Sequence, residues 1–113
     1  MFSKVLVANR GAVAARVLRS LKSLGIRTVA IYSDADRDLP YLAMAVECHS
    51  IGQSDPRSSY LNQDVLLDVL KRSGADGLHP GYGFLSENAS FAQRVNDSGS
   101  HFIGPSPRWI EAM

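Results

Sequence analysis

The sequence predicts an α/β fold: a doubly wound parallel sheet of about five strands in one domain. Short apolar, β-branched or aromatic runs alternate with segments of helical periodicity along the 113 residues. Strands that alternate with helices at this spacing form parallel sheets with right-handed crossovers, and the length suits a single domain. Three times a helical segment is followed by a glycine and then by strand residues: Leu24-Gly25-Ile26, Ser73-Gly74-Ala75 and Ser98-Gly99-Ser100.

The first half of the chain is expected to supply three strands. An apolar run at 5–8 predicts a central strand buried on both faces, followed by the turn Asn9-Arg10-Gly11. The spacing then becomes helical from residue 12, and Gly25 stands where a helix C′ glycine belongs. A second strand over 28–32, a short helix over 40–45 and a weaker strand over 46–51 follow. The predicted buried face of the first helix comprises Val13, Ala14, Val17, Leu18, Leu21 and Leu24.

The second half is expected to add two strands and three helices. Residues 52–59 hold Gly, Pro, Asp and three serines and predict a loop, after which Asn62 can cap a helix that ends at Gly74. A strand over 77–79, a helix over 89–97 and a strand over 101–103 follow. Ser106 and Pro107 predict the start of a last helix, which stops at Met113 without a C-cap and favours an N-terminal fragment.

Composition excludes several classes of function. The chain is 45% apolar and 20% charged with a net charge of +1, so no nucleic-acid or anionic-membrane footprint is visible. The N-terminus shows no signal peptide and no membrane span, which favours a cytoplasmic protein. One cysteine, Cys48, excludes an internal disulfide framework and is expected to be a small buried residue. His49 and His101 are too isolated for metal ligands, and no metal site is predicted.

The most elaborate turn of the chain, residues 79–88, is expected to border the ligand site. Parallel sheets of this type bind ligands beyond the carboxyl ends of their strands, where this turn lies. Gly81 and Gly83 permit positive φ and close approach of a ligand, and Ser86 or Asn88 can cap the following helix. Phe84 and Leu85 are expected to pack in the interior. The remaining residues of interest in this turn are His79, expected as a hydrogen-bonded strand-end residue, with Pro80, Tyr82 and Glu87.

The turn after the first strand does not favour dinucleotide binding. It has only one of the three glycines of that fingerprint, and the chain has no Walker-type phosphate loop. Arg10 is therefore interpreted as a fixed structural partner for loop carbonyls or carboxylates.

Five blocks of the sequence, in order, resemble the biotin carboxylase family. The turn at 79–88, His-Pro-Gly-Tyr-Gly-Phe-Leu-Ser-Glu-Asn, is similar to the family's signature loop almost letter for letter. The other blocks are 4–11, 33–36, 59–62 and 102–105, so the resemblance runs from end to end. It implies a Rossmann-like pre-ATP-grasp domain, with ATP-grasp and C-terminal domains absent from this chain.

The resemblance also implies a function. The complete enzyme would use ATP, Mg²⁺ and bicarbonate to carboxylate biotin on a carrier protein or domain, and a carboxyltransferase component would pass the carboxyl group to an acyl-CoA, pyruvate or urea. Tyr82, Gly83 and Glu87 would line the biotin and bicarbonate side of the cleft, with Asn9, Arg10, Gly11, His79, Pro80 and Gly81 shaping the ligand edge. No catalytic residue is expected in this chain, which alone would be inactive.

A homodimer is a further implication of the resemblance. A basic residue of the first helix, matching Arg19, contributes to the dimer contact in the family. Ala12 and Ser23 stand here where the family commonly has carboxylates. Two other classes of function stay open. One is a carbamoyl-phosphate synthase-like ligase, whose activity, unlike that of a biotin carboxylase, would not depend on free biotin. The other is a non-catalytic nucleotide-binding or assembly domain.

Overall fold

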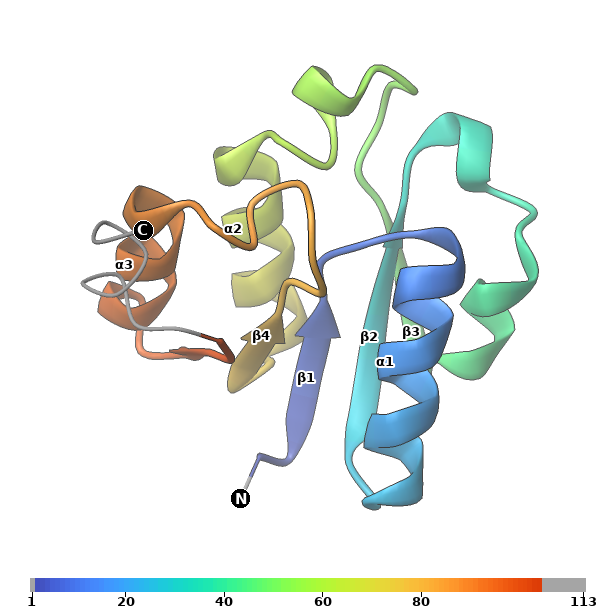
Figure 1. The fold of residues 1–113 in the computed structure, drawn as a ribbon, viewed down its shortest axis with the longest axis horizontal. Helices are drawn as coiled ribbons and strands as arrows, with labels where there is room; N and C mark the ends of the chain where they lie inside the picture. The colour runs from blue at the N-terminus through green and yellow to red at the C-terminus, as the bar shows by residue number, and fades with distance from the viewer. Residues whose placement is uncertain (1, 105–113) are drawn as a thin grey trace.

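A five-stranded parallel sheet forms the centre of the computed structural model, which describes residues 2–104 (Figure 1). The strand order is β3-β2-β1-β4-β5, and every neighbouring pair is parallel. This confirms the predicted α/β class and doubly wound sheet. The strands are β1 (Lys4–Val7), β2 (Arg27–Tyr32), β3 (Glu47–Ser50), β4 (Gly77–His79) and β5 (His101–Phe102).

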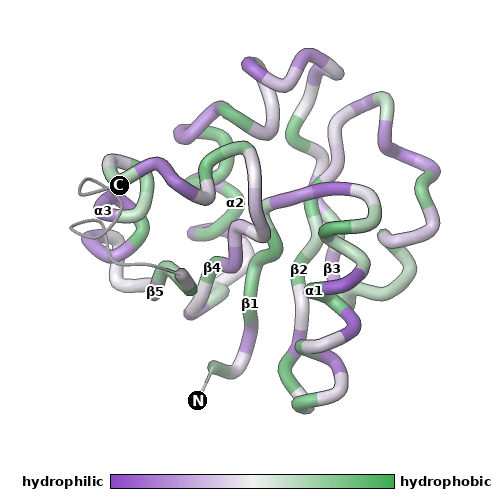
Figure 2. The backbone as a smooth tube through the Cα atoms, in the orientation of Figure 1, coloured by the Kyte–Doolittle hydropathy of each residue, from purple (hydrophilic) through white to green (hydrophobic). Residues whose placement is uncertain are grey.

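Helices cover both faces of the sheet. The α-helices are α1 (Gly11–Ser23), α2 (Gln63–Ser73) and α3 (Ala89–Asp97), and short 3₁₀ turns are η1 (Asp34–Asp36), η2 (Pro40–Met44) and η3 (Pro56–Ser58). Side chains alternate across β1: Val5 and Val7 pack in the cluster of α1, and Leu6 in the cluster of α2 and α3. Hydrophobic positions accordingly concentrate in the central strands (Figure 2). Each face therefore has its own apolar core.

Local signals place most helix ends where the sequence predicts them. Asn62 caps α2 by accepting from the Val65 amide, and Asn88 caps α3 by accepting from the Phe91 amide. Gly25 and Gly74, which follow α1 and α2, both have positive φ. Of the two caps considered for α3, Asn88 is therefore the one used.

Two predictions about burial are wrong. Leu24 is 61% exposed because α1 ends at Ser23, so the helical period no longer carries Leu24 to the buried face. Cys48 is exposed because β3 is an edge strand, paired only with β2. Its thiol lies 3.3 Å from the Leu42 carbonyl oxygen, and partial desolvation raises its pKa, the opposite of an activated thiol. The helix predicted from Ser106 lies outside the described residues.

The order of the strands defines a switch point between β1 and β4. From β1 the chain winds outward through β2 to β3, and after α2 it resumes on the other side of β1 with β4 and β5. The loops that leave β1 and β4 diverge to opposite faces here, because α1 follows β1 and α3 follows β4 (Figure 1). Open parallel sheets bind ligands at such a point. Among residues 2–104, no helix is both long enough and apolar enough to cross a membrane.

Candidate functional site

The side chain of Asn9 joins the two loops at the switch point. Asn9 is 3% exposed at the end of β1. Its amide nitrogen donates to the carbonyl oxygens of Pro80 and Tyr82, at 2.9 and 2.8 Å, and its amide oxygen accepts from the Arg10 N–H at 2.8 Å. One buried amide therefore satisfies backbone groups of both loops and fixes their separation.

Two glycines give the loop after β4 its shape, for different reasons. Gly81 has a φ of 67°, and a Cβ there would lie 2.7 Å from Val13 Cγ1 and 2.8 Å from Asn9 Nδ2. Gly83 has a φ of 77° but an open surrounding, with no atom within 4 Å of a Cβ. Gly81 is thus needed for both space and conformation, and Gly83 for conformation alone. The predicted positive φ of both is confirmed.

His79 ends β4 as a hydrogen-bonded residue, as predicted. Its Nδ1 accepts from the Gly81 N–H at 3.0 Å, and its carbonyl oxygen accepts from the Ala8 N–H at 2.9 Å. Burial lowers the pKa of the half-buried ring below its usual value. The neutral imidazole that this favours is also the form that can accept the Gly81 hydrogen bond.

The loop presents its remaining polar groups to the exterior. Tyr82 is 70% exposed, although its carbonyl is held by Asn9, and Gly83 and Glu87 are also exposed. Gly11 opens α1 on the other side of the switch point. A cavity of about 300 Å³ lies between this loop and α1, lined by Ala12, Val13, Arg16, Val17, His79, Gly81 and Tyr82. The loop therefore offers a surface for binding and orienting a ligand.

Arg10 pairs with a carboxylate, as its interpretation as a structural partner predicts. Its Nε and Nη2 donate to the two oxygens of Asp36, at 2.6 and 2.7 Å. Asp36 is 3% exposed and also accepts from the Tyr60 hydroxyl at 2.5 Å. The Arg10 hydrogen bonds lower the pKa of Asp36 and raise that of Arg10, so the pair stays ionised.

Asp36 and Tyr60 lie in two of the blocks that resemble the family, but the sequence pattern did not predict that they meet Arg10. A signal was available, because the ends of β1 and β2 meet at one edge of a parallel sheet. A carboxylate after β2 can therefore reach an arginine after β1. Phe84 and Leu85 pack inward as predicted: Leu85 is 6% exposed, and the Phe84 ring stacks on Tyr60.

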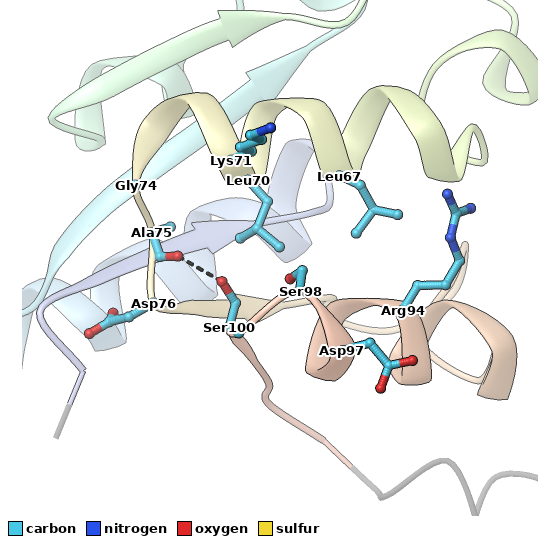
Figure 3. Close-up of a pocket in the computed structure, with 11 residues that line it drawn as sticks. Leu67, Leu70, Lys71, Gly74, Ala75, Asp76, Arg94, Asp97, Ser98 and Ser100 are labelled. Carbon is cyan, nitrogen blue, oxygen red and sulfur yellow. Dashed lines mark hydrogen bonds between the residues drawn. The ribbon is translucent and has the colours of Figure 1, made fainter.

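A larger groove lies at the opposite edge of the sheet. It has a volume of about 800 Å³ between α2 and α3, and Leu67 and Leu70 extend from α2 toward α3 (Figure 3). Its polar contacts lie at or near the surface, such as the 2.9 Å hydrogen bond from the Ser100 hydroxyl to the Ala75 carbonyl and the exposed hydrogen bond from Arg94 to Asp64. Within residues 2–104, no group of three or more His, Cys, Asp or Glu residues could hold a metal ion. The switch point is the stronger candidate because buried polar groups of several elements shape it.

Comparison with known proteins identifies the family. The model of the family described as "Biotin carboxylase, N-terminal domain" matches residues 1–110. The chain belongs to this family. Biotin carboxylase 2 of Bacillus subtilis is 50% identical over 113 residues, which are 100% of this chain and 26% of that protein. The chain therefore spans about a quarter of the length of this biotin carboxylase.

Solved structures of relatives share the fold of this biotin carboxylase N-terminal domain. Urea carboxylase of Kluyveromyces lactis superposes with a TM-score of 0.97 at 38% identity, over 99% of this chain and 10% of that one. The biotin carboxylase domain dimer of Hydrogenobacter thermophilus 2-oxoglutarate carboxylase, in complex with MgADP, ADP and bicarbonate, gives 0.94 at 48% identity. That match covers 100% of this chain and 25% of the other.

Proposed function

We propose that this domain works within a longer biotin carboxylase that carries out ATP- and bicarbonate-dependent carboxylation of carrier-bound biotin. The match covers the whole of this chain but only 26% of the Bacillus subtilis enzyme. ATP-grasp and C-terminal domains would therefore complete the protein. The acceptor would be an acyl-CoA, pyruvate or urea, reached through a carboxyltransferase component. The isolated 113 residues would be inactive.

The single observation that supports a binding role is the loop held open at the switch point. Asn9 anchors its backbone, and Tyr82 is left 70% exposed. We assign Tyr82 the role of a flat, partly apolar face with a hydroxyl donor beside the biotin ring. The Gly83 N–H would face a carbonyl or carboxylate, and Glu87 would orient an arginine from the later part of the protein.

The cofactors divide between this domain and the rest of the protein. Small-molecule sites combine apolar or aromatic surface with a few placed polar groups, and Tyr82 with the Gly83 N–H would offer both to biotin. We assign the phosphate-binding cations and the oxygen ligands that ATP and Mg²⁺ need to the later domains; within residues 2–104 no group of three or more His, Cys, Asp or Glu residues could hold a metal ion. In the complete enzyme, electrostatic stabilisation of the anionic reactants would therefore depend on later domains, with this domain positioning biotin.

The partners follow from the same proposal. A biotin carboxyl carrier protein or domain would deliver biotin to the switch point, and the ATP-grasp domain would close over it. Arg19 is exposed on the outer side of α1 and is the residue we assign to a homodimer contact. The biotin carboxylase domain of Hydrogenobacter thermophilus 2-oxoglutarate carboxylase is a dimer in its crystal structure. No nucleic-acid or membrane partner and a cytoplasmic location remain our expectations.

Bicarbonate-dependent ATP cleavage, measured with and without free biotin, tests the function. The full-length protein should cleave ATP faster when biotin is added, and the isolated domain should be silent. ATP cleavage that needs bicarbonate but ignores biotin would favour a carbamoyl-phosphate synthase-like ligase instead. Cleavage by the isolated domain would overturn the division of labour between domains.

A Tyr82→Ala variant of the full-length protein tests the binding loop. We expect KM for biotin to rise about tenfold, which corresponds to about 1.4 kcal/mol, with KM for ATP unchanged. Val46→Ala is the matched control because Val46 is also exposed, at 63%, but lies away from the switch point next to β3. An equal KM for biotin in the Tyr82→Ala and Val46→Ala variants would remove Tyr82 from the site.

A further inference from the structure

The binding loop has few hydrogen bonds of its own. Within residues 80–88, the Ser86 amide donates to the Gly83 carbonyl at 2.9 Å and the Asn88 amide to the Leu85 carbonyl at 3.1 Å. The Asn9 side chain holds the loop on the α1 side. The conformation between Tyr82 and Ser86 must therefore depend on packing from another element.

Phe84 is where the loop carries backbone strain. Its φ is 43°, the only positive value among the non-glycine residues of 2–104. A bulky residue in the left-handed region costs about 1–2 kcal/mol, so surrounding contacts must compensate. The Phe84 ring stacks on Tyr60, with ring centroids 5.1 Å apart and an interplanar angle of 18°. Such a pair contributes about 0.5–1.5 kcal/mol beyond area burial, the same order as the strain.

Tyr60 is itself held in place by its hydroxyl. The ring is 2% exposed, between η3 and α2 in sequence, and the hydroxyl donates to Asp36 and accepts from the Ser33 amide at 3.1 Å. Asp36 is held in turn by two hydrogen bonds from Arg10, the neighbour of Asn9. The loop is thus fixed at two points, and both supports lead back to the end of β1.

We propose that Tyr60, held by Asp36, is a positioning residue that sets the backbone of Gly83 and Phe84 and thereby the placement of Tyr82 and Glu87 on either side. The link to biotin depends on the proposed function, whereas the control of loop conformation does not. Tyr60 does not touch the ligand in this account. It acts through the stacked Phe84 ring.

Three variants of the full-length protein separate positioning from general stability. Tyr60→Leu removes the stacked ring, and Tyr60→Phe keeps the ring but removes the hydroxyl that holds it. Phe102→Leu is the matched control, because Phe102 is 3% exposed, belongs to the same core cluster and pairs with Phe91 at 6.2 Å rather than with the loop. Hydrogen exchange of the peptide covering 80–88 and KM for biotin and for ATP are measured for each.

We expect Tyr60→Leu to speed exchange of the loop peptide and to raise KM for biotin, each by about tenfold, with KM for ATP unchanged. Tyr60→Phe should change the exchange rate of the loop peptide and KM for biotin by about twofold to threefold each. Phe102→Leu should change neither the exchange rate nor KM for biotin, although it lowers Tm. Exchange in Tyr60→Leu equal to that in Phe102→Leu would overturn the proposal. Faster exchange with an unchanged KM for biotin would also overturn it, provided that Tyr82→Ala does raise that KM. A wild-type protein indifferent to biotin would instead defeat the proposed function, while the exchange data would still decide whether Tyr60 positions the loop.

Discussion

The two edges of the sheet solve the same structural problem in different ways. At the amino edge, Asp76 is exposed and accepts from the amides of Ser3 and Lys4, so the side chain that joins the starts of β1 and β4 lies at the solvent-exposed surface. At the carboxyl edge, Asn9 and Asp36 are each 3% exposed, so the side chains that join separate elements there are buried. The amino edge has the larger groove, and the carboxyl edge has the buried polar network.

This difference is the reason that the carboxyl edge, rather than the edge with the larger groove, is our candidate site. A buried polar group must find its partners in one arrangement, because an unmade hydrogen bond costs about 1–3 kcal/mol in the interior. Exposed groups can exchange their partners for water at little cost. The carboxyl edge therefore holds its loops in one conformation, which is what a site that orients a ligand requires.

Replacing Gly81 and Gly99 by alanine should separate the two edges most strongly. Both have positive φ, but a Cβ at Gly81 meets Val13 and Asn9 within 3 Å, whereas Gly99 has nothing within 4 Å. We expect Gly81→Ala to lower the free energy of unfolding by about 3–4 kcal/mol and Gly99→Ala by about 1–2 kcal/mol. Urea denaturation of both variants measures the difference in their free energies of unfolding. Equal losses of free energy would mean that Asn9 can move aside for the methyl group added at the Gly81 position.

Removing one carboxylate from each edge should give a smaller contrast. We expect Asp36→Asn to cost about 2 kcal/mol, because it weakens buried hydrogen bonds to Arg10 and Tyr60, and Asp76→Asn about 0.5 kcal/mol. Hydrogen bonds from Arg10 hold the pKa of Asp36 below its usual 3.8, so the unfolded chain binds the proton more readily. The stabilisation is therefore present above pH 3.8 and is lost as pH falls through the lower folded pKa.

Comparing urea midpoints at neutral and acid pH measures this effect. The difference in urea midpoint between wild type and Asp36→Asn should become smaller at acid pH. A difference that does not change with pH would contradict the ionised pair of Arg10 and Asp36.

The smallest effect concerns His79, which belongs to the carboxyl edge. Burial lowers its pKa below the usual 6.5, so folding favours the neutral ring. The unfolded state then binds more protons, and the stabilisation is complete above pH 6.5 and is lost as pH falls through the folded pKa. The free energy of unfolding, followed from about pH 7.5 to about pH 5.5, should fall further for wild type than for His79→Asn. Parallel curves would show that the ring is not desolvated.

Features that depend on neighbours in sequence were predictable. The caps Asn62 and Asn88 and the glycine Gly74 act within one turn of helix, so the residue type at the right offset is enough. The same reasoning failed for Leu24, because it assumed that the helix continues one residue further than it does. It failed for Cys48 because exposure of a strand residue depends on its place in the sheet.

The candidate site was predictable in part. The glycines, His79 and the location of the loop followed from residue types and from the rule that parallel sheets bind ligands at their carboxyl edge. The partner of Arg10 lies 26 residues away, and the Tyr60 ring reaches Phe84 from another element. Nothing in a linear pattern says which of several carboxylates or rings will meet.

By itself, the sequence determined the order of strands and helices, the helix ends, the family resemblance and the residues worth testing, because these depend on periodicity and on local backbone chemistry. Only the tertiary structure decided which polar groups are buried together and how the loop is held. The network of Arg10, Asp36, Tyr60 and Phe84 forms when separate strands bring their ends to one edge. Burial there makes its hydrogen bonds hard to exchange for water, and this gives the loop its single conformation.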